Sequence, residues 1–217
     1  QESYQEALRI RQQFYSTISH PEIADSLNSI GCAFVDQNDC NEAIVFFEQA
    51  LEIQNKHYSK EHPDMAQSYE NIGRVQERQR NYARALQFYE KARIILDKCY
   101  PDGHPIIANS MINIGRVHEM LKQYDQALVL YREAINTQEN YYPDGHPDTV
   151  QSLKQIGQLL MTQKKYDEAF AFLNQALSLQ QLYFHDGHPD TFSILVNIGA
   201  ILEKQRKYNF RRCFVLL

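Results

Sequence analysis

The sequence predicts an all-α protein built as an α-solenoid, in which similar pairs of helices stack along the chain. Two observations lead to this prediction. The dipeptide His-Pro recurs every 42 residues, at 20–21, 62–63, 104–105, 146–147 and 188–189. The dipeptide Ile-Gly keeps the same spacing, at 30–31, 72–73, 114–115, 156–157 and 198–199. Self-similarity at a fixed period of roughly 20 to 50 residues is typical of repeat architectures, whose units stack on their neighbours.

The glycines and prolines of the chain are used up by this repeat. Of the 8 glycines, five belong to the Ile-Gly pairs and three to Asp-Gly loops. Of the 7 prolines, five belong to the His-Pro pairs and the others are Pro101 and Pro143. None remains for a separate catalytic loop. The net charge of −5 gives no electrostatic footprint for nucleic acid.

The segment 104–145 illustrates the first helix of a repeat, helix A. Asp102-Gly103 is a turn signal, and Pro105 suits the first position of a helix, where its missing N–H is not needed. Apolar residues then recur at steps of three and four, at Ile107, Met111, Ile114 and Val117. This is the pattern of an amphipathic helix.

A second helix, helix B, follows the interruption at 122–124. Its pattern includes Ala127, Tyr131 and Ala134, and the same two alanine columns recur in the other repeats. Glycine inside a helix costs about 1 kcal/mol relative to alanine. We therefore expect the glycine of each Ile-Gly pair to be buried where helix B presses against the backbone of helix A.

The period divides the chain into seven predicted segments. Residues 4–15 match a helix B, aligned on Ala7, so 1–19 are assigned to a preceding repeat. In helix B after residue 208, Arg211 stands where the repeat has alanine. Because the chain opens at Gln1, we expect it to be a fragment. The segments are helix B of a preceding repeat at 1–19, full repeats at 20–61, 62–103, 104–145 and 146–187, helix A of a last repeat at 188–208, and a divergent C-terminal stub at 209–217.

The order of these motifs resembles that of a known family. An aliphatic residue before Ile-Gly, then Tyr-x-x-Ala-Leu, then an aromatic residue before Ala, resembles the tetratricopeptide repeat. The 42-residue period and the His-Pro pairs resemble the arrays of kinesin light chains and nephrocystin. The stretch "HPDMAQSYENIGRVQERQRNYARALQFYEKARII" at 62–95 is similar along its length to a light-chain repeat. This chain departs from light chains in its glycine, where they more often have alanine, and it lacks their heptad segment.

The resemblance implies a right-handed α-solenoid that binds a protein partner through a short linear peptide laid in a concave groove. It also implies a possible link to a microtubule motor. In such a groove the exposed positions of helix A flank the Ile-Gly pair. Asparagine recurs there with arginine one turn later, and a side-chain amide can both donate to and accept from a peptide backbone. The predicted peptide-binding residues are Asn71, Arg74, Asn113, Arg116, Lys154, Gln155, Gln158 and Asn197.

The cations among these residues lead us to expect an acidic peptide. Glu70, Glu77 and Glu119 act against this expectation, because they can pair with the arginines and neutralise them. The alternative interpretation of the whole face is an ordinary solvated helix surface.

We expect no catalytic site, no cofactor and no metal. The chain has no G-x-S-x-G, Walker or G-x-G-x-x-G motif. The five His-Pro histidines fit capping or packing at the start of helix A, and the pair His185 and His188 is weak evidence for a metal site. No apolar run is long enough for a membrane span. The four cysteines follow no repeat and form no C-x-x-C, which favours reduced thiols and a cytoplasmic location.

Two other functions fit the sequence. The array can be a regulatory or oligomerising arm of a larger enzyme whose catalytic domain lies outside this fragment. It can also be an architectural spacer with no ligand in its groove.

Overall fold

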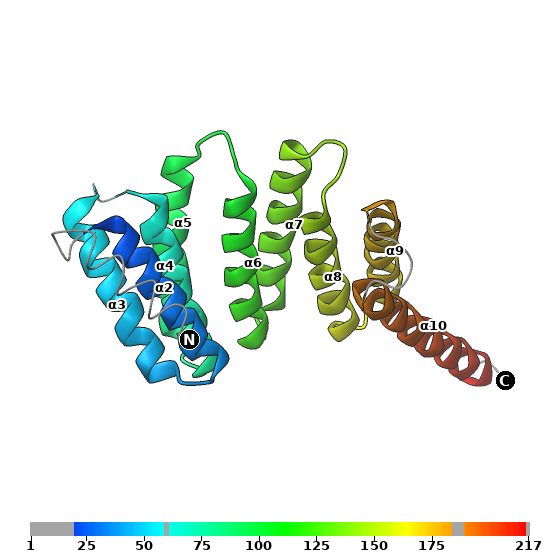
Figure 1. The fold of residues 1–217 in the computed structure, drawn as a ribbon. Helices are drawn as coiled ribbons and strands as arrows, with labels where there is room; N and C mark the ends of the chain where they lie inside the picture. The colour runs from blue at the N-terminus through cyan, green and yellow to red at the C-terminus, as the bar shows by residue number, and fades with distance from the viewer. Residues whose placement is uncertain (1–19, 59–60, 184–188, 216–217) are drawn as a thin grey trace. The chain divides into compact units, whose positions relative to one another are not determined.

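The structure is a computed structural model that describes residues 20–58, 61–183 and 189–215, with side chains up to residue 205 (Figure 1). Every regular element in these ranges is an α-helix. Internal contacts divide the chain into two units, Gln1–Leu121 and Lys122–Leu217, which are described separately. The predicted helix B at 1–19, the pair His185 and His188, and the side chains of 209–217 lie outside the described residues.

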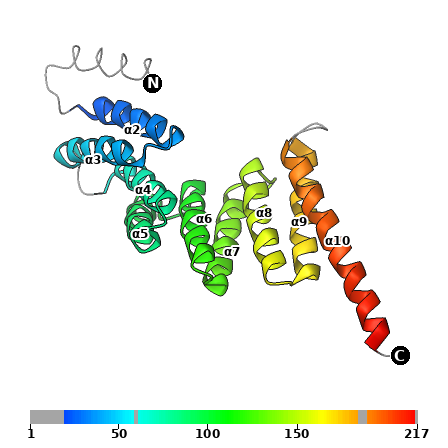
Figure 2. The same cartoon turned by 90° about the horizontal axis from the view of Figure 1, so that it is seen from below.

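The described residues of unit 1 form three A helices and two B helices. The A helices are α2 (Pro21–Asp36), α4 (Pro63–Arg78) and α6 (Pro105–Met120), and the B helices are α3 (Cys40–His57) and α5 (Tyr82–Cys99). Each helix packs against the next one in the chain, and α2 also contacts α4 (Figures 1 and 2). The helix A α2 therefore touches the next helix A as well as its own helix B.

Unit 2 contains α7 (Tyr124–Tyr141), α8 (Pro147–Thr162), α9 (Tyr166–Tyr183) and α10 (Pro189–Val215). Neighbours in the chain again pack together, and α8 also contacts α10. The prediction separates a helix A ending at 208 from a stub at 209–217, but α10 is one helix of 27 residues. No glycine or proline follows Gly199, so nothing in the backbone chemistry interrupts this helix.

The His-Pro pairs begin the A helices, and the capping role expected for histidine is confirmed. In α4, the His62 Nδ1 atom accepts the Asp64 backbone N–H at 3.3 Å, and Pro63 occupies the first helical turn. The His62 ring also stacks on Tyr58, with centroids 3.7 Å apart. The same cap begins α2, α6 and α8, and the same stacking recurs at the starts of α6 and α8.

The turns between helix A and helix B use a backbone conformation that the sequence pattern does not reveal. One residue in each turn has a positive φ between 61° and 64° without being glycine. Single residues can adopt this left-handed conformation at modest cost when the surrounding structure fixes it. These residues keep the 42-residue spacing and are Asn38, Arg80, Lys122 and Lys164.

The glycines of helix A lie against large side chains of helix B. A methyl group on Gly31 would lie 2.5 Å from Phe47, and one on Gly73 would lie 2.8 Å from the Tyr89 ring. Gly157 faces Leu173 in the same way. The alanine columns at 43, 85, 127 and 169 and at 50, 92, 134 and 176 are completely buried.

The burial prediction is wrong at the last Ile-Gly pair. Gly199 is exposed, and no atom lies within 4 Å of a methyl group placed on it. The physical reason is that no helix B follows α10 within the described residues. The close approach of Gly31, Gly73 and Gly157 therefore depends on the helix B that follows each of them.

Candidate protein-interaction site

The predicted groove position two residues before each Ile-Gly isoleucine is mostly buried. Asn28, Ile112 and Lys154 are 6%, 8% and 7% exposed, and Glu70 is partly buried. Val196 is 52% exposed, and no A helix follows α10 in the described residues. This position therefore belongs to the packing of the helices and not to an open surface.

A column of buried serines with the same 42-residue spacing lies in this helix packing. Asn28 donates from Nδ2 to Ser68 Oγ at 2.8 Å, and Ser68 donates to Gln54 Oε1 at 2.9 Å. In unit 2, Ser152 donates to Gln138 Oε1 at 2.7 Å. These hydrogen bonds satisfy polar groups inside the helix packing, where unpaired ones are costly. The predicted site omits this serine column, although its 42-residue spacing at 26, 68, 110 and 152 is a readable signal.

Glu70 lies near Ser110, the serine of this column that has no glutamine in the preceding helix B to accept its hydrogen bond. The chain has Leu96 where the other repeats have Gln54 and Gln138, and Ser110 Oγ has no hydrogen-bond partner in the described part of the chain. Glu70 Oε1 is likewise buried without a hydrogen bond there. Burial raises the pKa of Glu70 to about 7, and the nearby Ser110, Arg74 and Asn113 oppose this only in part.

Asn71 and Arg74 form a small polar cluster with Cys32. Arg74 donates from Nη2 to Asn71 Oδ1 at 3.1 Å and to Cys32 Sγ at 3.2 Å. The guanidinium is exposed, and neither acceptor is charged. Asn71 is only 8% exposed, and its Nδ2 donor has no hydrogen-bond partner among the described residues.

Arg116 occupies the same repeat position as Arg74 but is tied to a carboxylate. Its Nε and Nη2 atoms donate to the two oxygens of Glu77 at 2.7 and 2.8 Å, and Nη2 also donates to Asn113 Oδ1 at 3.2 Å. The hydrogen bonds that Glu77 accepts from Arg116 raise the pKa of Arg116 and keep it charged. Tyr89 donates to the same carboxylate at 2.9 Å, and burial raises the pKa of Tyr89. Arg116 thus links α4 to α6.

In unit 2 the predicted site again contains one cation held by a carboxylate and several amide side chains that are at least partly exposed. Lys154 donates to Asp190 Oδ1 at 2.6 Å, which links α8 to the first turn of α10. Gln158 is exposed, whereas Gln155 and Asn197 are partly exposed. The structure therefore leaves amide groups on this face but gives its buried lysine a structural partner.

Two further classes of site receive no support in the described ranges. No group of three or more histidine, cysteine, aspartate or glutamate side chains is arranged to hold a metal ion in the part of the chain that the structure describes. No described helix has both the length and the apolar character needed to cross a membrane.

Comparison with known families decides the classification. A model of the tetratricopeptide repeat matches residues 1–56, 39–98, 64–140 and 148–209. The chain belongs to the tetratricopeptide repeat family. Tetratricopeptide repeats are modules for protein–protein interaction, and this array is a protein-interaction module. No curated protein matches the chain.

Solved tetratricopeptide structures confirm the all-α solenoid. A Podosopora anserina protein described as a kinesin light chain with nearly identical TPR-like repeats is 19% identical with a TM-score of 0.73, over 90% of this chain and 93% of that one. BtubC (BKLC) from P. vanneervenii is 18% identical with a TM-score of 0.82, over 96% and 84%. Aspartyl phosphate phosphatase F from Bacillus subtilis is 16% identical with a TM-score of 0.78, over 99% of this chain and 53% of that chain. At these identities the likeness establishes the fold alone, which is the all-α solenoid that the repeat predicts.

Proposed function

We propose that this tetratricopeptide array is a non-catalytic adaptor whose A helices bind an extended acidic peptide of a partner protein. Asn71 and Asn113 contact the peptide backbone, and Arg74 pairs with a carboxylate of the peptide. In unit 2, Gln155, Gln158 and Asn197 offer further amide groups.

The unpaired Nδ2 donor of Asn71 is the observation that carries this proposal. A buried donor without an acceptor costs about 1–3 kcal/mol, so a ligand that supplies a carbonyl oxygen regains that energy. Arg74 lies on the same turn of α4 and already holds Asn71 Oδ1, which leaves Nδ2 as the free end of the amide. An extended peptide offers such carbonyl groups along its length.

Arg74 is the cation best suited to an acidic ligand. The expected roles of Arg116 and Lys154 are weakened, because each already has a carboxylate partner within 3 Å. A peptide carboxylate would have to displace Glu77 or Asp190 from them and leave a buried charge unpaired, which is unfavourable. Among the described residues, Arg74 hydrogen-bonds to the neutral groups of Asn71 and Cys32, its charge also acts on nearby Glu70, and its side chain is exposed to solvent.

A titration with paired variants tests the proposal. A fluorescein-labelled acidic peptide is added to the intact chain and to the Asn71→Ala/Arg74→Ala variant, and binding is followed by fluorescence anisotropy. The intact chain should bind with micromolar affinity, about −8 kcal/mol, and more weakly as salt is raised. The variant should bind roughly tenfold more weakly or worse, because it loses a backbone hydrogen bond and a charge.

Arg132→Ala is the matched control. It also removes an exposed arginine, which pairs with Glu168 in unit 2, and should leave the affinity unchanged. The proposal is contradicted if the intact chain and the double variant bind equally well. It is also contradicted if the A-helix face, the surface around Asn71 and Arg74, prefers a basic peptide.

A further inference from the structure

A cavity of about 580 Å³ lies in unit 2, where the loop between α7 and α8 meets α9. Its apolar wall includes Pro143, Leu179 and Leu182, and its polar wall includes Glu139 and Asp144. A volume of roughly 300–1,000 Å³ is typical of sites that receive a ligand group. None of the residues of the candidate peptide-binding site lines it.

The cavity is kept open by the geometry of the loop. Gly145 has a φ of +89°, and a methyl group on it would lie 2.7 Å from Leu179 Cδ1. The Tyr183 hydroxyl donates toward the carbonyl oxygens of Asp144 and Gly145, at 2.9 and 3.0 Å, and so fastens the loop to α9. On the other side, Tyr142 stacks on His146 with centroids 4.0 Å apart. The wall is therefore preorganised in the folded chain.

The mouth of the cavity is unusually apolar for this repeat. Leu182 is 70% exposed, whereas earlier repeats carry Lys56 and Lys98 at the same position. Lys98 pairs with Glu61 of the preceding loop. Tyr183 beside Leu182 is also 41% exposed. Exposed apolar side chains grouped at a cavity are typical of a site that a partner covers.

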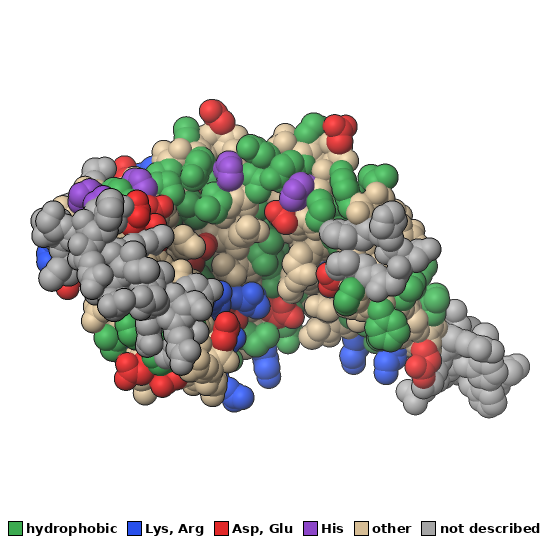
Figure 3. Space-filling view, viewed as in Figure 1, with side chains coloured by type: hydrophobic (Ala, Val, Ile, Leu, Met, Phe, Trp, Pro, Cys, Tyr) green, Lys and Arg blue, Asp and Glu red, His purple; other side chains and the backbone are tan. Residues whose placement is uncertain are grey.

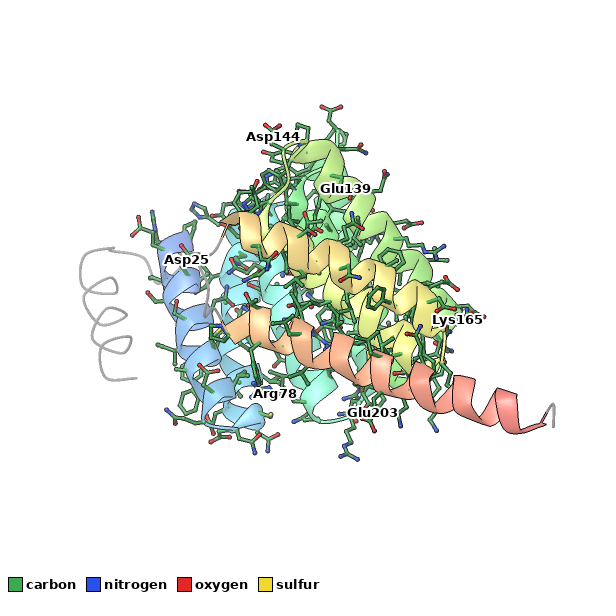
Figure 4. All side chains as sticks on the ribbon, turned by 90° about the vertical axis from the view of Figure 1, so that its right-hand side faces the viewer. Asp25, Arg78, Glu139, Asp144, Lys165 and Glu203 are labelled. Carbon is green, nitrogen blue, oxygen red and sulfur yellow. The ribbon has the colours of Figure 1, made fainter. Side chains whose placement is uncertain are left out.

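The charges around the cavity are acidic. Glu139 and Asp144 line it from α7 and from the loop that follows, and Figure 4 labels both near the upper end of α7. Asp148 at the start of α8 lies 3.5 Å from His146, and the α9 lining contains no charged residue. No lysine or arginine lines the cavity, and Glu139 and Asp144 have no ion-pair partner among the described residues. Lys164 and Lys165 follow the far end of α8, and Figure 3 shows basic side chains gathered at the lower edge of unit 2.

We propose that this cavity is a second protein-binding site, which takes a bulky aliphatic side chain flanked by lysine or arginine in a partner protein. The aliphatic group fills the space between Leu179, Leu182 and Pro143. The flanking cations approach Glu139 and Asp144, which also steer the partner toward the mouth. The site is independent of the A-helix face and prefers the opposite charge.

Three labelled peptides of equal length test this proposal on the full chain. The first has leucine between two arginines, the second has serine in place of the leucine, and the third has glutamates in place of the arginines. Only the first should bind well, with the serine peptide weaker by roughly tenfold because it buries less apolar surface. In methyl NMR spectra, the first peptide should shift the signals of Leu179 and Leu182.

Leu182→Lys is the informative variant, because the repeat already accepts lysine at this position in two places. It should weaken binding of the first peptide roughly tenfold, since it removes apolar area and adds a repelling charge. The control Asp125→Asn changes a carboxylate in the first turn of the same helix as Glu139 and should bind normally. Undiminished binding by Leu182→Lys, absence of binding by the first peptide, or methyl shifts confined to other residues would overturn the proposal.

Discussion

Arg74 and Arg116 occupy the same position of the repeat, yet their guanidinium groups have different partners. The difference lies in the preceding A helix, where the position that faces the arginine is Val35 in one case and Glu77 in the other. Only Arg116 can therefore form the bidentate ion pair that joins two A helices. The sequence identifies Glu77 as a rival partner, but it does not reveal how deeply the pair is buried, because burial depends on how the helices stack.

Glu70 should make the stability of the protein depend on pH in a defined direction. In the folded chain its pKa is raised to about 7 from the ordinary 4.5, so the folded state keeps a proton that the unfolded state loses between these values. The stability contributed by this group is therefore present below pH 4.5 and is lost as the pH rises toward 7. Glu70→Gln, which cannot ionise, should match the parent near pH 4.5 and exceed its stability by up to about 2 kcal/mol at pH 8, after allowance for partial exposure.

Urea unfolding of parent and variant at pH 5 and pH 8 measures this effect. The exposed Glu90 of α5 provides the control, because Glu90→Gln makes the same charge change away from the helix packing. A gain for Glu70→Gln that is the same at both pH values would contradict the burial argument.

Helices A and B begin and end where the local chemistry requires it. The start of each described helix A was readable from His-Pro, because histidine caps the helix and proline tolerates its first turn. The turns between A and B were not readable, since residues such as Arg80 and Lys164 adopt a positive φ only because the packed helices impose it. The length of α10 was not readable either, because helix periodicity alone does not fix where the last helix ends.

Two glycines at equivalent positions should respond in opposite ways to the same substitution. A methyl group at position 73 meets the Tyr89 ring at 2.8 Å, so Gly73→Ala should lower stability by roughly 1–3 kcal/mol through overpacking. Position 199 is open and helical, so Gly199→Ala should raise stability by about 0.5–1 kcal/mol. Thermal unfolding of both variants gives the comparison, and a Gly73→Ala protein as stable as the parent would show that the helices do not need this close approach.

The repeats share the same small residues where helix A packs on helix B, but they differ in the side chains that connect one repeat to the next. The alanine columns of helix B are fully buried throughout the described repeats. By contrast, the position two residues before the Ile-Gly pair changes from Asn28 to Glu70, Ile112 and Lys154. The constant columns are why the fold could be predicted from the sequence. The changing positions are why individual partners, such as Lys154 with Asp190, required the structure.

The A-helix face also differs from repeat to repeat in what it leaves available to a partner. Asn71 and Asn113 are equivalent residues, and each accepts a hydrogen bond from the arginine one turn later. Only Asn71 lies beside an arginine without a carboxylate partner in the described ion pairs. We therefore expect Asn71 and Arg74 of α4 to make the main contacts of this tetratricopeptide array with its peptide partner.

The side-chain amide signals of Asn71 show whether this residue contacts the peptide. They are assigned in the NMR spectrum of the full chain by comparison with Asn71→Asp, and an acidic peptide is then added to saturation. The Asn71 NH₂ signals should move downfield as Nδ2 gains an acceptor, and Arg74→Ala should weaken binding of the peptide. If the peptide binds while these signals stay unmoved and the shifts fall on other helices, the A-helix face around Asn71 is not the interaction site.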